Sequence, residues 1–307
     1  MPALARLHRL AWPLAVASLV ANIGIVVTGG AVRLTDSGLG CPTWPRCTEQ
    51  SYVPHAALGL HGAIEFGNRM LTWVLAAVAI ATFLSLWRSD RARATRLSAI
   101  IAIGVPAQGV VGGITVLTDL NPWLVSLHLL LSMAMIGVCV LLLDELRGPA
   151  RRATGRLRRI AWLVFGTTWF VLYLGTVVTG SGPHSGDLES RRTGLDPQVM
   201  SHVHAAAVYV LLAVTVGLLV VARRQGATVV SHAVGALLLL ELAQGLLGFV
   251  QYVTDLPEIL VGLHMLGAAV ISAAATWALL STRSRPASPP QPKSSGSKAT
   301  ATNSSDR

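Results

Sequence analysis

The stretch AQGVVGGITVLTDLNPWLVSLH (107–128) decides the fold, because the chain repeats it as AQGLLGFVQYVTDLPEILVGLH (243–264). The two copies align without a gap at an offset of 136 residues and share Ala-Gln-Gly, Thr-Asp-Leu and Leu-His. A shorter match, GIVVTGG (24–30) with GTVVTGS (175–181), has a different offset because the loops that follow it differ in length. The sequence therefore predicts two tandem halves of similar structure.

The composition is that of a membrane protein. Of the 307 residues, 52% are hydrophobic and 12% are charged, and the mean hydropathy is +0.59, which is too apolar for an ordinary soluble domain. A bilayer core is crossed by roughly 20 helical residues. Segments of that length lie near residues 10–30, 65–87, 97–117, 122–143, 160–180, 200–222, 228–252 and 258–281. The first is long for the apolar region of a cleavable signal peptide, so we interpret it as a span.

The predicted fold class is therefore an all-α integral membrane protein, with eight transmembrane helices arranged as two tandem, pseudo-symmetric four-helix bundles. The halves cover residues 1–145 and 160–282 and are joined by a basic linker at 146–159. An even number of spans separates the repeats, so both halves share one orientation. The tail at 283–307 is rich in Pro, Ser and Lys, and we predict that it is disordered.

Most positive residues fall on alternate connections, which sets the predicted orientation. They are Arg6, Arg9, Arg88, Arg91, Arg93, Arg96, Arg147, Arg151, Arg152, Arg156, Arg158, Arg159, Arg223, Arg224, Arg283, Arg285, Lys293 and Lys298. This pattern places both termini on the cytoplasmic side of the cell membrane. The net charge of +10 is then a signal of topology and of attraction to anionic lipid in the bilayer. It does not indicate nucleic-acid binding, because the chain has no soluble basic domain.

Three histidines lie inside apolar spans at similar predicted depth. His128, His204 and His264 each follow a proline by six or seven residues, which puts them roughly 10 Å below the outer surface. Rings at one level suggest iron ligation in the core of a bundle, whereas a lone intramembrane histidine is often an interhelical hydrogen-bond partner. Zinc is disfavoured because no Cys or carboxylate lies at that depth in the second half to complete a tetrahedral site.

The first half departs from its copy in the second span. At the offset of 136, His204 falls on Asn68, so the expected ring is missing. The segment LHGAIEFGNRM (60–70) instead places His61, Glu65, Asn68 and Thr72 on one helical face, with Arg69 four residues after Glu65. Two interpretations stay open: a structural ion pair at the membrane edge, or a carboxylate that exchanges protons beside a redox centre.

Together these motifs resemble the heme A synthase family of membrane enzymes. The resemblance lies in TGGAVRLTDSGLGCPTWPRC (28–47), IEFGNR (64–69), TGSGPHSGD (179–187) and the two Leu-His helices. It implies a haem b cofactor in the C-terminal half and a haem O substrate in the N-terminal half. It also implies oxidation of a methyl group of haem O to a formyl group, with water as the oxygen source, for cytochrome oxidase biogenesis.

Carried over residue by residue, the resemblance makes His204 and His264 the axial ligands of haem b iron. His128 becomes a ligand on the substrate haem iron, and Glu65 the carboxylate needed for catalysis. The family pattern has His immediately before Arg69, where this chain has Asn68. Either His61 takes over that role or the substrate iron has His128 alone. The candidate catalytic residues are Glu65, His128, His61, Asn68 and Arg69.

Cys41 and Cys47 lie in the connection between the first two spans, on the predicted outer side where disulfides persist. Some members of the family carry a Cys pair in this loop, so the resemblance also favours a Cys41–Cys47 bridge.

The resemblance leaves the electron acceptor unnamed, and it makes a haem O synthase (protohaem farnesyltransferase) a candidate partner. A competing interpretation is a di-haem b cytochrome that only transfers electrons, but such a protein needs a ligand pair in each half. A carrier or assembly scaffold is a third possibility, since parallel repeats are common among carriers. It leaves the histidines at one level unexplained.

Overall fold

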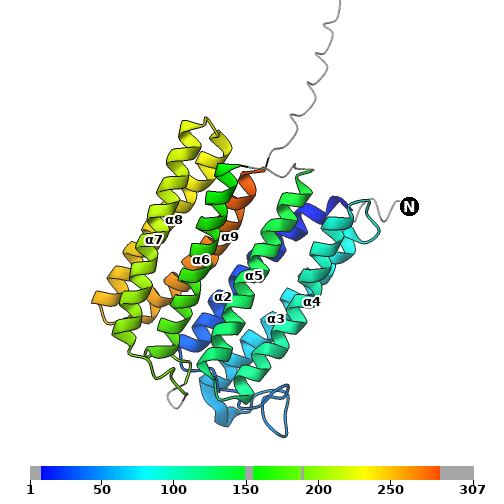
Figure 1. Ribbon diagram of the computed structural model, residues 1–307. Helices are drawn as coiled ribbons and strands as arrows, with labels where there is room; N and C mark the ends of the chain where they lie inside the picture. Colours follow the sequence, from blue (N-terminus) through cyan, green and yellow to red (C-terminus); the bar gives the residue numbers. More distant parts are fainter. Residues whose placement is uncertain (1–7, 149–154, 188–189, 284–307) are drawn as a thin grey trace, which may run out of the picture.

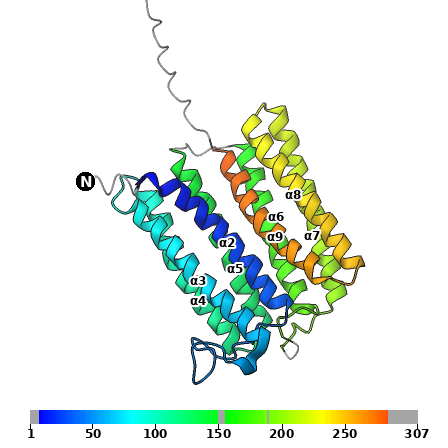
Figure 2. The same cartoon turned by 180° about the vertical axis from the view of Figure 1, so that it is seen from behind.

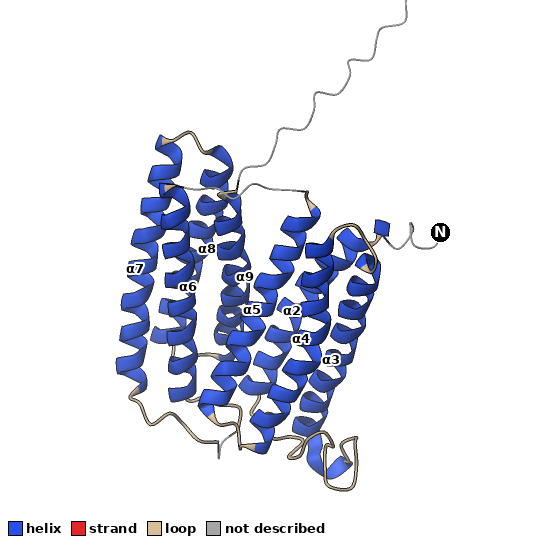
Figure 3. Ribbon diagram, turned by 45° about the vertical axis from the view of Figure 1, so that its right-hand side comes forward, coloured by secondary structure: helices blue, strands red, loops and turns tan. Residues whose placement is uncertain are grey.

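A computed structural model of the chain describes residues 8–148, 155–187 and 190–283. Within these ranges the secondary structure is helical, with no strands (Figure 3). The elements are α2 (Ala11–Leu34), the short 3-10 helix η1 (Ala56–Leu58), α3 (Gly59–Leu86), α4 (Ala92–Leu117), α5 (Pro122–Leu146), α6 (Arg156–Ser181), α7 (Pro197–Arg224), α8 (Thr228–Val253) and α9 (Glu258–Ser281). The eight long helices are each long and apolar enough to cross a membrane. The predicted all-α membrane fold is confirmed.

The helices form two bundles that stand side by side (Figures 1 and 2). In each bundle consecutive helices pack together and the first also contacts the last, so that α2 to α5 and α6 to α9 each close a ring. The bundles meet through α5 with α6 and α9, and through α2 with α9. The architecture is the one that the repeated stretch predicts.

Each bundle has its own apolar core, and a smaller cluster lies between them. Fully buried side chains include Ile101 and Leu142 in the first half and Leu218 and Leu237 in the second. Between the bundles, Ile136 of α5 packs with neighbours from α2 and α9. These contacts hold the two halves in one fixed arrangement.

The internal repeat extends to the backbone of the turns. The turns between α4 and α5 and between α8 and α9 contain Asp119-Leu120 and Asp255-Leu256, and all four residues have positive φ between 52° and 60°. The N–H of Leu120 donates to the carbonyl of Thr115 at 2.9 Å, and the N–H of Leu256 donates to that of Gln251 at 2.8 Å. Two turns of this uncommon conformation at an offset of 136 residues support the duplication.

Four helices, α3, α4, α6 and α7, begin three to six residues earlier than their apolar runs predict. α7 begins at Pro197, where the N–H group that proline lacks would have no partner within the helix anyway. The Asp196 side chain caps the helix by accepting from the N–H groups of Gln198 and Val199. α3 begins at Gly59 rather than near residue 65, because the polar and Gly-rich turn that contains His61 is already helical.

The two ends of the molecule differ. One, the arginine-rich end, carries the start of α2, α4, α6 and α8 and the described residues Arg9, Arg88, Arg91, Arg93, Arg147, Arg156, Arg158, Arg223, Arg224 and Arg283. The other, the loop end, carries the connection between α2 and α3, which includes both loop cysteines (Figure 1). Most of the predicted basic linker (149–154) and the predicted disordered tail from 284 onward lie outside the described residues.

Candidate functional site

Each of the three intramembrane histidines lies against a glycine of the preceding helix. A Cβ atom built on Gly112 of α4 would lie 3.4 Å from Cε1 of His128. A Cβ on Gly175 of α6 would lie 3.3 Å from Cε1 of His204, and one on Gly248 of α8 would lie 3.1 Å from Cε1 of His264. Glycine is therefore the residue that lets each imidazole approach the neighbouring helix backbone this closely.

Two equivalent glutamines tie the histidine-bearing helices to their neighbours. The side-chain amide of Gln108 donates to the carbonyl of His128 at 3.2 Å and to Oγ of Ser132 at 2.8 Å. The amide of Gln244 donates to the carbonyl of His264 at 2.7 Å. Interhelical bonds of this kind fix the helices in register, so both repeats hold their histidine at the same depth.

The three rings lack firm partners of their own. The Nδ1 atoms of His128 and His264 are buried without a hydrogen-bond partner, and that of His204 has only a weak contact with the backbone of Val171. His204 and His264 are close enough to interact electrostatically. Buried polar atoms are normally paired, so rings left in this state fit a ligand role, and neutral imidazole is the form that binds iron. The second half thus offers two such rings, which is the number of imidazoles in a bis-histidine haem site.

The fourth equivalent position holds an asparagine. The shorter sequence match pairs Gly24 of α2 with Gly175, and a Cβ on Gly24 would meet nothing within 4 Å. The side chain of Asn68 instead accepts a hydrogen bond from Oγ1 of Thr28 at 2.8 Å. The first half therefore keeps the glycine of the pair without the imidazole, and it offers one ring, that of His128.

His61 does not fill this gap at the same depth. It lies in the first turn of α3, is exposed, and its Nδ1 is 3.0 Å from Oγ of Ser37. Asn68 is seven residues further along the helix, which is about 10 Å along the axis. His61 is placed at the loop end of the first half, above the level of His128, and its predicted role as a ligand stays a prediction.

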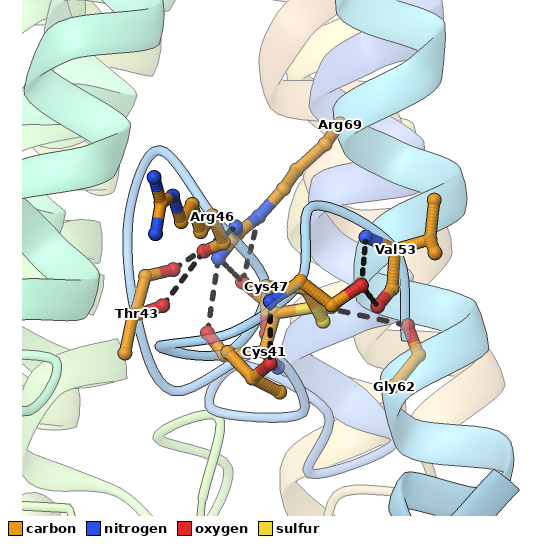
Figure 4. The surroundings of a disulfide bond; sticks show 10 residues. Cys41, Thr43, Arg46, Cys47, Val53, Gly62 and Arg69 are labelled. Atoms are coloured by element: carbon orange, nitrogen blue, oxygen red, sulfur yellow. Dashed lines mark hydrogen bonds and ion pairs between the residues drawn. A yellow bond between two sulfur atoms is a disulfide. The ribbon is translucent and has the colours of Figure 1, made fainter. Parts of the chain in front are cut away.

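Glu65 and Arg69 form the ion pair that their spacing predicts, and the pair also holds the loop. Nη2 of Arg69 is 2.5 Å from Oε1 of Glu65, and Oε2 of Glu65 accepts from the backbone N–H of Cys41 at 2.6 Å. The guanidinium also donates to the carbonyls of Cys41, Thr43 and Arg46 at 3.0 to 3.1 Å (Figure 4). The carboxylate is only 5% exposed, so its charge is compensated inside the protein.

Cys41 and Cys47 are joined by a disulfide, and both residues are fully buried (Figure 4). The loop between them reaches from α3 to α4, because a Cβ on Gly113 of α4 would overlap the indole of Trp44. The adjacent residue, Gly112, faces His128. The disulfide loop therefore covers the loop end of the first bundle beside that histidine.

One buried polar group was missed by sequence reasoning. Glu241 of α8 is 3% exposed, Oε1 accepts from Oγ1 of Thr215 at 3.1 Å, and Oε2 has no hydrogen-bond partner. It lies seven residues from Gly248 toward the arginine-rich end, so it is about 10 Å deeper than the His264 ring. The signal in the sequence was a carboxylate in the middle of an apolar span. Among the described residues no group of three or more His, Cys, Asp or Glu side chains is arranged to hold a metal ion by itself.

A family model described as Cytochrome oxidase assembly protein (COX15-CtaA) matches residues 12–183, more than half of the chain. Curated relatives include Heme A synthase from Bradyrhizobium sp. (strain ORS 278), 32% identical over 206 residues, which are 55% of this chain and 56% of the relative. Heme A synthase from Geobacillus thermodenitrificans is 32% identical over 144 residues, 44% of this chain and 43% of the relative. The chain spans about half the length of the curated relatives it matches. On the match to the family model, the chain belongs to the COX15-CtaA family of cytochrome oxidase assembly proteins.

Proposed function

We propose that the protein is a heme A synthase, which oxidises a methyl group of haem O to a formyl group by successive hydroxylations with water as the oxygen source. The observation that carries the proposal is the difference between the halves. The second half has two imidazoles on glycines, whereas the first has His128, Asn68 and the buried pair of Glu65 and Arg69. The names of the curated relatives support the same activity.

The second half, residues 160–282, is proposed to hold haem b between His204 and His264. Two rings that interact with each other, each against a glycine and without a firm partner, fit this cofactor. Bound there, haem b would accept the electrons removed from the substrate. The chain contributes the two imidazoles, and Gln244 fixes the depth of His264.

The first half, residues 1–145, is proposed to bind haem O, with His128 as the ligand on the substrate iron. Each hydroxylation adds the oxygen of one water molecule to the methyl carbon and releases two electrons and two protons, and the geminal diol that the second hydroxylation forms loses water to give the formyl group. Glu65 is the group proposed to accept protons, because it is a buried carboxylate one helical turn from Asn68 on the same face. Arg69 and the N–H of Cys41 hold its two oxygens in place.

The disulfide loop is proposed to keep bulk water out of the substrate compartment. It is tied to α3 by Arg69 and to α4 by Trp44, so it lies over the loop end of the bundle near His128. A covered site of low dielectric strengthens the electrostatic interactions of Glu65 with its partners. Opening of this loop would then admit water when an oxygen atom is needed.

The proposed orientation has the arginine-rich end in the cytoplasm, by the positive-inside rule. Both termini are then cytoplasmic, and the haem sites and the disulfide lie toward the outer side of the cell membrane, where disulfides persist. The proposed partners are the haem O substrate, a haem O synthase (protohaem farnesyltransferase) that supplies it, and an electron acceptor that reoxidises haem b.

Haem extraction tests the proposed activity. The full-length protein is purified from a host that makes haem O, and its haems are identified by chromatography and mass spectrometry. We expect haem b together with haem O, a hydroxylated intermediate or haem A. Two haem b molecules per chain and no other haem would favour the di-haem b cytochrome, and a protein without haem would contradict both functions.

A further inference from the structure

A cavity lies at the arginine-rich end of the first half, far from the candidate haem sites. Its volume is about 420 Å³, within the range of pockets that hold small molecules. It is bounded by the start of α2, the end of α3, the turn that leads into α4 and the end of α5. No residue of the histidine sites or of the disulfide loop lines it.

The rim of the cavity is basic. Arg9, Arg88 and Arg91 line it together with one carboxylate, Asp90. Within the described part of the chain, none of these three arginines is paired with a carboxylate, whereas the nearby Arg93 lies 3.3 Å from Glu145. Arg91 donates one of its N–H groups to the carbonyl of Leu146 at 2.9 Å. A guanidinium has five N–H donors, so most of this donor capacity remains for an anion.

The wall of the cavity is apolar. Trp12 of α2, Leu86 of α3 and Leu146 of α5 line it beneath the arginines. The guanidinium of Arg147 also lies over the Trp12 ring, 5.7 Å from its centroid, in a cation–π contact. A site with a cationic rim and a hydrocarbon wall matches an amphipathic anion better than a small, fully hydrated one.

The backbone conformation at Arg88 distinguishes this end of the first half from the equivalent end of the second half. Arg88 has φ of 60°, a left-handed conformation that is uncommon for a residue other than glycine. At the offset of 136, Arg88 matches Arg224, and the left-handed residue of that turn is Gly226, with φ of 64°. The first half thus uses an arginine as the left-handed residue of this turn, two positions before the point that matches Gly226, although glycine adopts this conformation with less strain.

We propose that this cavity binds the headgroup of an anionic phospholipid, with the phosphate on Arg88 and Arg91 and the first part of the acyl chains against Trp12. Guanidinium groups bind phosphate oxygens in pairs, and basic pockets between transmembrane helices on the cytoplasmic side suit acidic lipid headgroups. This assignment does not rest on the proposed activity, because it concerns a separate site.

The test is a lipid titration of the full-length protein. Delipidated protein in detergent is titrated with phosphatidylglycerol or phosphatidylcholine and observed by native mass spectrometry. The proposal predicts one tightly bound phosphatidylglycerol in preference to phosphatidylcholine. The Arg88→Gln/Arg91→Gln variant should weaken that binding by roughly thirty-fold, since each arginine near a membrane surface contributes about fivefold. The Arg88→Lys/Arg91→Lys variant keeps both charges but loses the paired bonds of the guanidinium groups, so it should bind more tightly than the Gln variant and less tightly than wild type.

The matched control is Arg223→Gln/Arg224→Gln, which removes two charges at the equivalent end of the other half. It should leave the tight site unchanged. If the control loses as much affinity as the cavity variant, or if the cavity variant binds as wild type does, the assignment is wrong. Competition by inorganic phosphate alone at equal affinity would also overturn it, because the site would then recognise a free anion and not a lipid.

Discussion

The contact between Gly248 and His264 gives a prediction that separates ligand geometry from helix stability. In a Gly248→Ala variant, the new Cβ would lie 3.1 Å from Cε1 of the ring. Carbon atoms pack best at about 3.5–4.0 Å, so the imidazole has to move by at least about 0.4 Å. Overpacking of this kind costs about 1–3 kcal/mol, whereas alanine favours a helix over glycine by about 1 kcal/mol.

These opposing terms leave the unfolding free energy of the haem-free protein nearly unchanged or lower by up to about 2 kcal/mol. Because the displaced ring no longer lies where the iron needs it, we expect the overpacking cost of about 1–3 kcal/mol to appear in haem binding. The affinity for haem b should then fall by roughly 5- to 150-fold. Gly245, three residues earlier on α8, is the matched control, because a Cβ there would meet nothing within 4 Å.

The assay uses full-length wild type, Gly248→Ala and Gly245→Ala, purified from the same host. Haem b per chain and its rate of transfer to an apo-globin acceptor are measured, together with the thermal melting of the haem-free forms. We expect faster loss of haem b in Gly248→Ala only. Equal retention of haem b in the two variants would refute the placement of the His264 ring as an iron ligand.

Three further predictions concern the first half and the missed carboxylate. Asn68→His should place a ring beside the open side of Gly24, at the loss of one hydrogen bond worth about 1 kcal/mol. The substrate haem should then have a low-spin spectrum, and an unchanged spectrum would contradict the equivalence of the four positions. Arg69→Gln should release the loop by removing its bonds to three carbonyls, seen as faster amide hydrogen exchange at residues 41–47, and exchange at the wild-type rate would contradict this clamp. Glu241→Gln should keep its unfolding free energy within about 1 kcal/mol of wild type, because the amide oxygen still accepts from Thr215. Glu241→Ala should have a clearly lower melting temperature, because the substitution leaves a cavity. Similar melting temperatures of the two variants would contradict the burial of this side chain.

The fold was predictable because two independent patterns agree. The hydrophobic runs determine the number of spans, and the repeat at an offset of 136 determines how they group into halves. The start of α3 was predicted too late, because the apolar run of that helix begins after its first polar and glycine-containing turn.

The candidate site was predictable only in part. The histidines and the substitution at Asn68 follow from the alignment of the repeat with itself, and the Glu65–Arg69 pair follows from helical spacing. The glycine beneath each ring was not predicted, because glycines are common in membrane helices and only the packing shows which of them face a ring.

The two remaining features, the bonds from Arg69 to the disulfide loop and the buried Glu241, depend on contacts between elements that are far apart in the sequence. The bonds from Arg69 to the disulfide loop join residues of two elements, and no local pattern specifies the course of that loop. Glu241 was overlooked because the rest of its span is apolar and its partner, Thr215, lies on another helix.

The central claim is that the two halves bind different haems through different histidines. The most direct measurement is the haem content of His204→Ala and His128→Ala, each purified as a full-length chain from a host that makes haem O. We predict that His204→Ala loses haem b and keeps the substrate haem, and that His128→Ala loses the substrate haem and keeps haem b. If both variants lose the same haem, or if both keep both haems, the claim that each half binds a different haem is contradicted.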